Sequence, residues 1–584
     1  MKEHMNTEGK RYVGYLILGV CMLGVIAVRA FYITRTAGPF IYADELGYWS
    51  HAAHMTGNTW AGVMDGVSWY SFGYSFWLAL TFFLSDRMLV MYRIAIAINI
   101  CMGLCTFAAA YRIIRRYLPE HDRLVSGLLA FAVTTYPTYV FYSYTTLSET
   151  LVALIVWLLF YELVSMEERP AWWKAMALGV TASYGFMVHY RMLAVLGAVG
   201  VCLLVLLITH KINWKHLLLI AVSAGVLFIG YLFMKEYLTL AIVRNEVVES
   251  TGGVVSQGSY NTFEFAVRKF LRMFRWTSIK NVLLNVMGQI WECLSSSYLL
   301  VGLGSAYCVK QIWKGKKTTE SACLYIYPVV SLLCSIGMTG IVAYGKLMPQ
   351  AGGRVRLDLA FSGRYSAPLI PLLVTAACVM LLQSEYQFVW KCYAGTLLVY
   401  LAVSVGVFIR LHGVEDGYLN IVSTVAIHIF HWLGDFSVLK CALIAVAVSL
   451  VFIGLCCIKW RNRLNYCAAF LMIIFLFSTT ALYCMRTSIR GENDNTARYT
   501  PMFEYLTENT DKGEIVYICQ DGKMSYDLQT RLVDKAVVCT LPEHLAGLEE
   551  GTCVVMRLEQ IDAANITGYE VCLENEEYIV IRMR

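Results

Sequence analysis

Long apolar runs interrupt this sequence and constrain its fold more than any motif does. A helix that crosses the hydrocarbon core of a bilayer needs about 20 mostly apolar residues. Of the 584 residues, 58% are hydrophobic and only 15% are charged, which is too apolar for a soluble globular chain. We therefore expect a polytopic α-helical membrane protein with about 13 transmembrane helices. The predicted spans are 12–33, 88–111, 124–145, 147–165, 172–188, 192–209, 216–238, 285–308, 321–343, 365–383, 390–410, 438–458 and 465–485.

The basic residues between these runs predict the orientation, because cytoplasmic loops carry an excess of Lys and Arg. The clusters share one side if the N-terminus is a cytoplasmic, retained signal anchor and if residues 72–84 form an interfacial or re-entrant helix. This places the protein in the plasma membrane, with outer loops at 34–87, 239–284 and 344–364 and an extracytoplasmic C-terminus. The clusters are 112–123, 169–174, 211–215, 310–317, 391 and 459–463.

Charge and cysteine content exclude other classes. The formal net charge of +6 is small for this length and says nothing about nucleic acid. From the apolar composition we expect the lipid bilayer and no nucleic acid among the partners. Most of the 19 cysteines lie in apolar runs, where a free thiol behaves as a small hydrophobe, and no Cys-x-x-Cys spacing occurs. The sequence predicts no cysteine metal site. Four cysteines of the C-terminal part could pair in an oxidising compartment, but their places in strands fit core packing equally well. These are Cys519, Cys539, Cys553 and Cys572.

The composition changes after Arg486, where the apolar spans stop and the charge rises. Short apolar runs at 514–519, 536–540, 552–556 and 578–582 are typical of buried strands. We predict a membrane domain over 1–485 and a small extracytoplasmic α/β domain over 486–584. No catalytic motif is present in the second domain.

The first outer loop opens with two adjacent carboxylates, Asp44 and Glu45, and continues with His51 and His54. Such groups at a membrane surface can act as acids or bases or bind a metal. On the acidic pair alone, an ordinary loop with solvated carboxylates is the more common arrangement. The two histidines are more typical of polar loop residues than of ligands.

Other polar residues occur at the outer ends of the predicted spans. Arg354, Arg356 and Arg364 lie on the side that basic residues usually avoid, and binding of a phosphate would explain them. An arginine that snorkels to the interface is the alternative for each. Glu149 lies between apolar helices, where a carboxylate is costly and usually has a partner.

Four motifs, in order, resemble the GT-C superfamily of membrane glycosyltransferases, in particular the branch of protein O-mannosyltransferases and lipid A aminoarabinose transferases. An acidic pair opens the first outer loop, and an interfacial helix precedes an Arg at the start of the next span. A Pro and an acid flank the turn of a helical hairpin, and an Arg-Tyr-x-x-Pro-x-x-Pro signal opens a later span. These are Asp44-Glu45 with Tyr48, Gly73 to Leu80 with Met91-Tyr-Arg93, Tyr136-Pro to Ser-Glu149, and Arg364 to Pro371.

The resemblance implies a GT-C fold and an inverting transfer of a sugar from a polyprenyl-phosphate donor to an acceptor hydroxyl on the outer face. The acceptor would be a cell-envelope polymer, a glycolipid or a protein. Asp44 would be the general base, Glu45 or Glu149 would orient the acceptor, and Asp44 with Glu149 are the residues for a divalent metal. The donor phosphate would meet Arg364, Tyr365, Arg354, Arg356, Arg191 and His189.

Two other function classes share parts of this pattern. A polymerase or ligase of lipid-linked saccharides would also have many spans and outer arginines, without needing the acidic pair after the first span. A transporter of lipid-linked saccharides would place charges within its spans and show repeated halves. The ionisable residues gather at the outer ends of helices, which favours surface chemistry.

Overall fold

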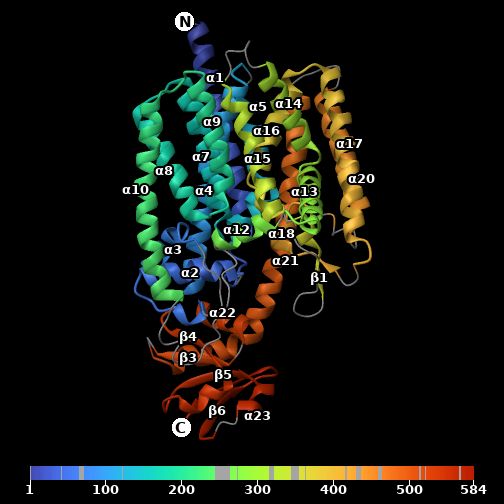
Figure 1. The fold of residues 1–584 in the computed structure, drawn as a ribbon. Coiled ribbons are helices and arrows are strands. Elements are labelled where there is room, and N and C mark those ends of the chain that lie inside the picture. Colours follow the sequence, from blue (N-terminus) through green and yellow to red (C-terminus); the bar gives the residue numbers. More distant parts are fainter. Residues whose placement is uncertain are drawn as a thin grey trace.

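The computed structural model of this chain is a bundle of long helices with a small β-sheet at one end (Figure 1). The N-terminus lies at the opposite end of the bundle. The structure describes residues 2–40, 43–64, 71–120, 123–243, 263–272, 274–314, 321–342, 347, 354–361, 363–414, 417–428, 430, 436–457, 463–511, 514–519, 521–564 and 567–584.

The prediction of a polytopic helical membrane protein is confirmed. Within the described ranges, 8 helices are long and apolar enough to cross a membrane, or 9 with one bent pair, and two shorter apolar helices accompany them. The count of about 13 stays a prediction. The helices near predicted spans are α1 (Lys2–Ala30), α4 (Met88–Tyr117), α7 (Glu149–Glu168), α8 (Trp172–Val188), α9 (Met192–Ile208), α10 (Trp214–Leu238), α15 (Cys323–Val342), α16 (Ile370–Gln383), α17 (Tyr386–Leu411) and α20 (Val438–Cys457).

The predicted span 124–145 is not one straight helix. It consists of α5 (Arg123–Thr134) and a second piece, Pro137–Tyr144, with a bend of 70° between them. Pro137 cannot continue the helical hydrogen-bond ladder. The buried Arg29 side chain satisfies the freed backbone, because it donates to the carbonyls of Thr134 and Tyr139. The second piece, which comprises α6 (Pro137–Phe141) and η2 (Tyr142–Tyr144), leads directly towards Glu149.

The prediction of one span over 285–308 is wrong. Two helices, α13 (Trp276–Ser296) and α14 (Leu300–Lys314), replace it. Tyr298 and Leu299 separate them with φ values of 50° and 65°, and this left-handed backbone ends a right-handed helix. The helix α13 therefore begins in the predicted outer loop 239–284, which also contains α12 (Phe263–Arg272).

The last span continues far beyond its predicted end at residue 485. The helix α21 (Arg463–Asn509) has 47 residues, which at 1.5 Å per residue is roughly 70 Å and more than twice the hydrocarbon thickness. The composition change at 485/486 therefore falls inside a helix and does not mark a break in structure. Figure 1 shows α21 leaving the bundle and reaching the sheet.

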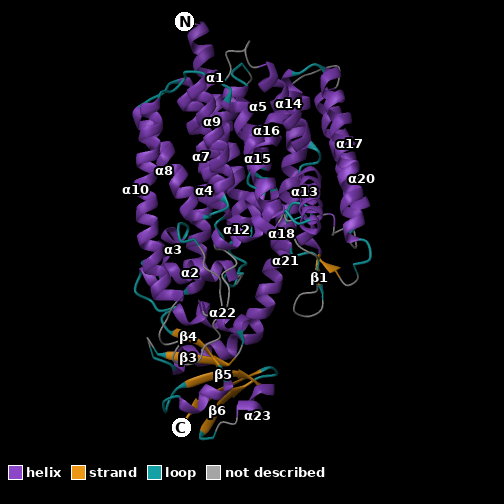
Figure 2. Ribbon diagram, viewed as in Figure 1, coloured by secondary structure: helices purple, strands orange, loops and turns teal. Residues whose placement is uncertain are grey.

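The C-terminal domain has a five-stranded mixed sheet in the order β4-β3-β5-β7-β6 (Figure 2). The strands β4, β3 and β5 are parallel, and β7 and β6 are antiparallel to their neighbours. The four predicted strands are present, and β6, whose residues are mostly half-buried or exposed, lacks the apolar run of the others. The elements are β3 (Ile515–Cys519), α22 (Gly522–Arg531), β4 (Ala536–Thr540), η6 (Pro542–Gly547), β5 (Cys553–Arg557), η7 (Leu558–Gln560), α23 (Ile561–Ala564), β6 (Tyr569–Glu574) and β7 (Tyr578–Met583).

Short elements lie at the sheet end of the bundle (Figure 1), and one of them, Ala61–Met64, contacts β4 and α22 of this domain. The helix predicted over 72–84 is the 8-residue α3, about 12 Å long, so the prediction that it does not cross the membrane is confirmed. Residues 65–70, 244–262 and 348–353 of the predicted outer loops lie outside the described ranges. The elements are α2 (Ala43–Met55), η1 (Ala61–Met64), α3 (Ser75–Phe82), η3 (Thr239–Val243), β1 (Val355–Arg356), η4 (Leu357–Ala360), η5 (Gly363–Tyr365), β2 (Gly417–Tyr418) and α18 (Ile421–Thr424).

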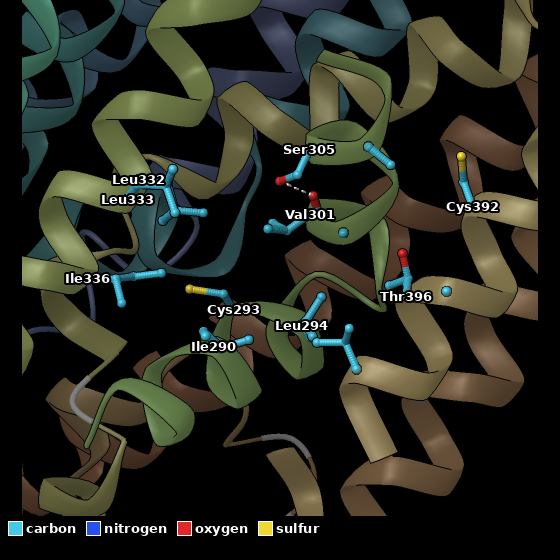
Figure 3. Close-up of a pocket in the computed structure, with 14 residues that line it drawn as sticks. Ile290, Cys293, Leu294, Val301, Ser305, Leu332, Leu333, Ile336, Cys392 and Thr396 are labelled. Atoms are coloured by element: carbon cyan, nitrogen blue, oxygen red, sulfur yellow. Dashed lines mark hydrogen bonds between the residues drawn. The ribbon is translucent and has the colours of Figure 1, made fainter. Parts of the chain in front are cut away.

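A cavity of about 480 Å³ lies between α13, α14, α15 and α17 (Figure 3). Its lining is apolar apart from two hydroxyls and two thiols, and it includes no ionisable acid or base. The Ser305 hydroxyl is already bonded to the Val301 carbonyl. Such a lining suits a hydrocarbon chain and not reacting groups.

Candidate active site

The acidic pair lies in the first turn of α2, where the helix dipole favours negative charge. The two side chains have different surroundings. The Asp44 side chain is 33% exposed, whereas Glu45 is fully buried. The Oε1 atom of Glu45 accepts hydrogen bonds from the backbone N of Thr146 at 2.6 Å and from its Oγ1 at 2.9 Å. Glu45 thus attaches α2 to the segment before α7, and Asp44 is the accessible acid.

Glu149 is the first residue of α7, and the bent α5–α6 segment brings it to the same place. Its Oε1 atom lies 2.6 Å from Arg364 Nε and 3.2 Å from Arg191 Nη1. The side chain is only 2% exposed. The sequence-based expectation that this carboxylate has a charged partner is confirmed, and the partners come from two separate outer segments.

Arg364 joins the two acids, since its Nη2 lies 2.9 Å from Asp44 Oδ2 while its Nε binds Glu149. Burial alone would lower the pKa of Arg364, but the carboxylates of Glu149 and then Asp44 raise it well above its usual value. The preceding Gly363 lies directly on the side chain of Glu292, since a Cβ at Gly363 would be 2.2 Å from Glu292 Cδ. This close approach fixes the short turn that presents Arg364.

Arg191 is buried and incompletely paired. Apart from the ion pair between its Nη1 and Glu149, its Nε and Nη2 have no hydrogen-bond partner among the described residues, and neither has Glu149 Oε2. The guanidinium carbon lies 5.9 Å from the centre of the Tyr365 ring. Unpaired buried donors are costly, so these atoms point to a ligand with oxygen acceptors.

His189 lies next to Arg191 and accepts a hydrogen bond from its backbone N through Nδ1, at 3.2 Å. Burial, followed by the charge of Arg191, lowers the pKa of His189 well below its usual value. The imidazole is therefore neutral near pH 7. It can orient a ligand by hydrogen bonding, but it adds no positive charge to the site.

The other two predicted arginines have contacts of their own. Arg354 is exposed and lies over the ring of Tyr418, 5.3 Å from its centre. Arg356 Nη2 lies 2.5 Å from Asp358 Oδ2. Of the three arginines of this outer loop, Arg364 is the one whose ion pairs join the two predicted acids.

The histidines of α2 are also placed. His51 is buried, and burial followed by the neighbouring His54 lowers its pKa to about 3. His54 Nε2 lies 3.1 Å from the hydroxyl of Tyr237, near the end of α10. These contacts fit the view of both residues as polar packing groups.

Several supporting residues have no signal in the sequence. Thr146 holds Glu45, and the Tyr48 hydroxyl donates to Ser148 Oγ at 3.0 Å. A hydroxyl in a polar turn has no distinctive pattern. Arg29 did have a signal, because a charge inside the apolar run 12–33 usually has a buried partner.

The two carboxylates do not form a cation site as they stand. Asp44 Oδ2 and Glu149 Oε1 are both paired with Arg364, and no group of three or more metal-type side chains occurs among the described residues. A divalent ion would need several oxygen ligands here. The arrangement of the two carboxylates fits a guanidinium better than a divalent cation.

Comparison with solved structures supports the fold. A crystal structure of ArnT from Cupriavidus metallidurans bound to undecaprenyl phosphate matches with a TM-score of 0.52 and 13% identity, over 98% of each chain. The Archaeoglobus fulgidus oligosaccharyltransferase in its apo form matches with a TM-score of 0.44 and 10% identity, over 94% of this chain and 70% of the other. No family model and no curated protein matches the sequence.

The resemblance that the motifs indicated is thus confirmed at the level of the fold. ArnT, whose match carries this statement, is the lipid A aminoarabinose transferase. The match with ArnT extends over the C-terminal part as well, because it includes almost the whole of both chains.

Proposed function

From the fold shared with ArnT, we propose that this protein is a glycosyltransferase that uses a polyprenyl-phosphate sugar. It transfers the sugar, with inversion, to a hydroxyl of a cell-envelope polymer, glycolipid or protein at the outer face of the plasma membrane. The observation that carries this proposal is the cluster of Asp44, Glu149, Arg191 and Arg364, which combines one accessible acid with two guanidinium groups, of which that of Arg191 is buried and incompletely paired.

Asp44 is the general base in this proposal. As the acceptor oxygen bonds to the anomeric carbon, the bond from that carbon to the phosphate oxygen breaks, and the hydroxyl proton passes to Asp44. Glu45 and Glu149 are both buried, so Asp44 is the acid of the three that an acceptor reaches. A carboxylate positioned in this way contributes typically 10²–10⁴-fold, by general base catalysis.

The arginines receive the leaving phosphate. The free Nε and Nη2 of Arg191 are charge-assisted donors, and Arg364 adds a second guanidinium beside them. Tyr365 lies next to both and supplies a hydroxyl. Glu149 holds the two guanidinium groups together, because otherwise their charges would repel each other.

The lipid part of the donor requires apolar surroundings. The cavity between α13 and α17 has an apolar lining that suits a hydrocarbon chain. The helix α13 separates this cavity from Arg364, because α13 lines the cavity and its Glu292 side chain lies against Gly363. This supports a lipid-linked donor over a soluble nucleotide sugar. In the predicted topology the N-terminus is cytoplasmic, and the site and the C-terminal domain lie outside the cell. A transfer there from a lipid-linked donor needs no nucleotide sugar.

The experiment that tests the proposal measures sugar transfer in proteoliposomes from a panel of polyprenyl-phosphate monosaccharides, with nucleotide sugars as the control. We expect sugar transfer from at least one lipid-linked donor, with release of polyprenyl phosphate, and no sugar transfer from nucleotide sugars. Use of lipid-linked oligosaccharides alone would favour a polymerase or ligase. Movement of intact donor across the bilayer without cleavage would favour a transporter.

A further inference from the structure

The segment that leads into α2 is attached to the far end of α21. Asn493 Oδ1 accepts from the backbone N of Ala37 at 3.0 Å, and Asn493 Nδ2 donates to the carbonyl of Arg35 at 2.9 Å. Arg531, at the end of α22 in the C-terminal domain, donates to the carbonyl of Ala37 at 3.1 Å. Both polar groups of Ala37 are therefore bonded to the C-terminal part of the chain, seven residues before Asp44.

Arg531 is itself held in place. Its Nη2 donates to Thr496 Oγ1 at 2.8 Å, and its guanidinium lies over the ring of Phe503, 5.7 Å from the centre. It also packs against Gly38, where a Cβ would lie 3.0 Å from Nη2. A guanidinium fixed on three sides is a rigid attachment point and not a mobile surface side chain.

A second attachment follows α2. The indole of the buried Trp60 donates to the carbonyl of Val533 at 2.9 Å. Two residues later the backbone of Gly62 lies against β4 so closely that a Cβ would be 2.4 Å from the carbonyl oxygen of Val537. The helix that carries the acidic pair therefore lies between two contacts with the same domain.

We propose that the C-terminal domain is a positioning element for the reaction, which holds α2 at both ends so that Asp44 stays in place beside Arg364. The inference rests on the proposed function. Arg531, Asn493 and Trp60 are its positioning residues, and none of them touches the reacting groups.

The need for such a device follows from the contacts of α2. On the bundle side, Glu45 is bonded to Thr146, whereas Asp44 is partly exposed and is held by Arg364 alone among the described residues. A shift of about 1 Å at a reacting group can cost roughly 100-fold in rate. Attachment at Ala37 and Trp60 limits the tilt of α2 that would produce such a shift.

The test compares the full-length wild type with Arg531→Ala, Asn493→Ala and the control Arg584→Ala in proteoliposomes. Arg584 belongs to the same domain and forms an exposed ion pair with Glu570, far from these contacts in the fold. Amide hydrogen exchange is measured in residues 43–55 and in strands β3 to β5. For the same variants we measure the kcat of transfer and the Kd for a polyprenyl-phosphate sugar.

We expect exchange in residues 43–55 to rise about fivefold in Arg531→Ala and Asn493→Ala, because each loses hydrogen bonds to the segment before α2. The kcat should fall roughly tenfold or more while the Kd stays within about twofold. The strands and the control should match the wild type. Unchanged exchange and kcat in both variants, or equal acceleration in α2 and the strands, would overturn the proposal. Absence of transfer by the wild type would instead refute the proposed function, and the exchange measurement would still report on the attachment.

Discussion

Two acid–arginine clusters among the described residues, one in the bundle and one in the C-terminal domain, differ in their hydrogen bonding. In the domain, Asp521 Oδ2 accepts from Arg557 Nε at 2.8 Å and from the Tyr578 hydroxyl at 2.7 Å, while Oδ1 accepts from the backbone N of Met524. In the bundle, Arg191 Nε and Nη2 and Glu149 Oε2 have no partner among the described residues. The cluster in the domain is closed, whereas the cluster in the bundle is open to a ligand.

The comparison shows that an ion pair between separate segments does not by itself identify a functional site. Both clusters join distant segments, and both combine a carboxylate with an arginine and a nearby tyrosine. The donors that stay unpaired are what distinguish them, because a structural cluster satisfies its own polar groups. We therefore expect substitutions in the bundle to change donor binding and transfer, and substitutions in the domain to change stability.

The largest effect on donor binding is expected for Arg191→Lys. Lysine keeps the charge near Glu149 but lacks the fork of donors that fits a phosphate. Donor affinity should fall about 10- to 100-fold, since one or two charge-assisted hydrogen bonds are lost. Donor binding in detergent or proteoliposomes measures the effect. The same change at the exposed Arg169, at the other end of α7, should leave the affinity unchanged. An equal change of donor affinity in Arg191→Lys and Arg169→Lys would contradict the assignment of the bundle cluster as the donor site.

A smaller effect, on stability alone, is expected for Asp521→Asn. Burial would raise the pKa of Asp521, but the hydrogen bonds from Tyr578, Met524 and Arg557 outweigh it and lower the pKa below its usual value. The lowered pKa means that ionised Asp521 stabilises the fold at pH values above its unfolded-state pKa of about 3.9. This stabilisation is lost as the pH falls through the folded-state pKa. The substitution should cost the domain about 1–3 kcal/mol at pH 7, because buried partners lose an acceptor.

Hydrogen exchange of β3 and β5 between pH 7 and acidic pH measures this effect. Wild type should lose protection as the pH falls below about 4, and Asp521→Asn should lose less over that interval. The exposed Asp511→Asn serves as the control. A large loss of transfer with full protection of the strands would show that the closed cluster also takes part in the reaction.

The smallest effect is expected from removal of divalent metals. Arg364 and Arg191 together already balance the two negative charges of Asp44 and Glu149, so EDTA should change transfer by less than about twofold. Transfer assays with and without the chelator, followed by addition of Mg²⁺ or Mn²⁺, measure this. Loss of activity that a metal restores would mean that the two carboxylates bind a cation when the donor is present.

The sequence was sufficient for the membrane class, most helices and the main charged residues of the site. Asp44, Glu149 and Arg364 could be found because a charge at the end of an apolar run is costly and therefore informative. The pairing itself could not be derived, since Arg364 lies 320 residues from Asp44 and 215 from Glu149 in the chain. Thr146, Asn493 and Arg531 had no signal, because their roles arise from contacts between distant backbone segments.

Helix boundaries were less predictable for a related reason. The hydropathy of 285–308 predicts one span. Tyr298 and Leu299, however, adopt a left-handed backbone that neither residue type favours, and this divides the segment into two helices. Beyond residue 485, polar residues continue α21 as readily as apolar ones, since helix propensity does not depend on burial.

The central claim is that Asp44 is the base of a transfer from a lipid-linked sugar. The most direct measurement is the single-turnover transfer rate of Asp44→Asn with a saturating polyprenyl-phosphate sugar, with donor binding measured separately and the exposed Asp86→Asn as the control. We expect the rate to fall about 10²–10⁴-fold, while donor affinity stays within about threefold of wild type. A wild-type rate in Asp44→Asn, with the donor bound and consumed, would contradict the account.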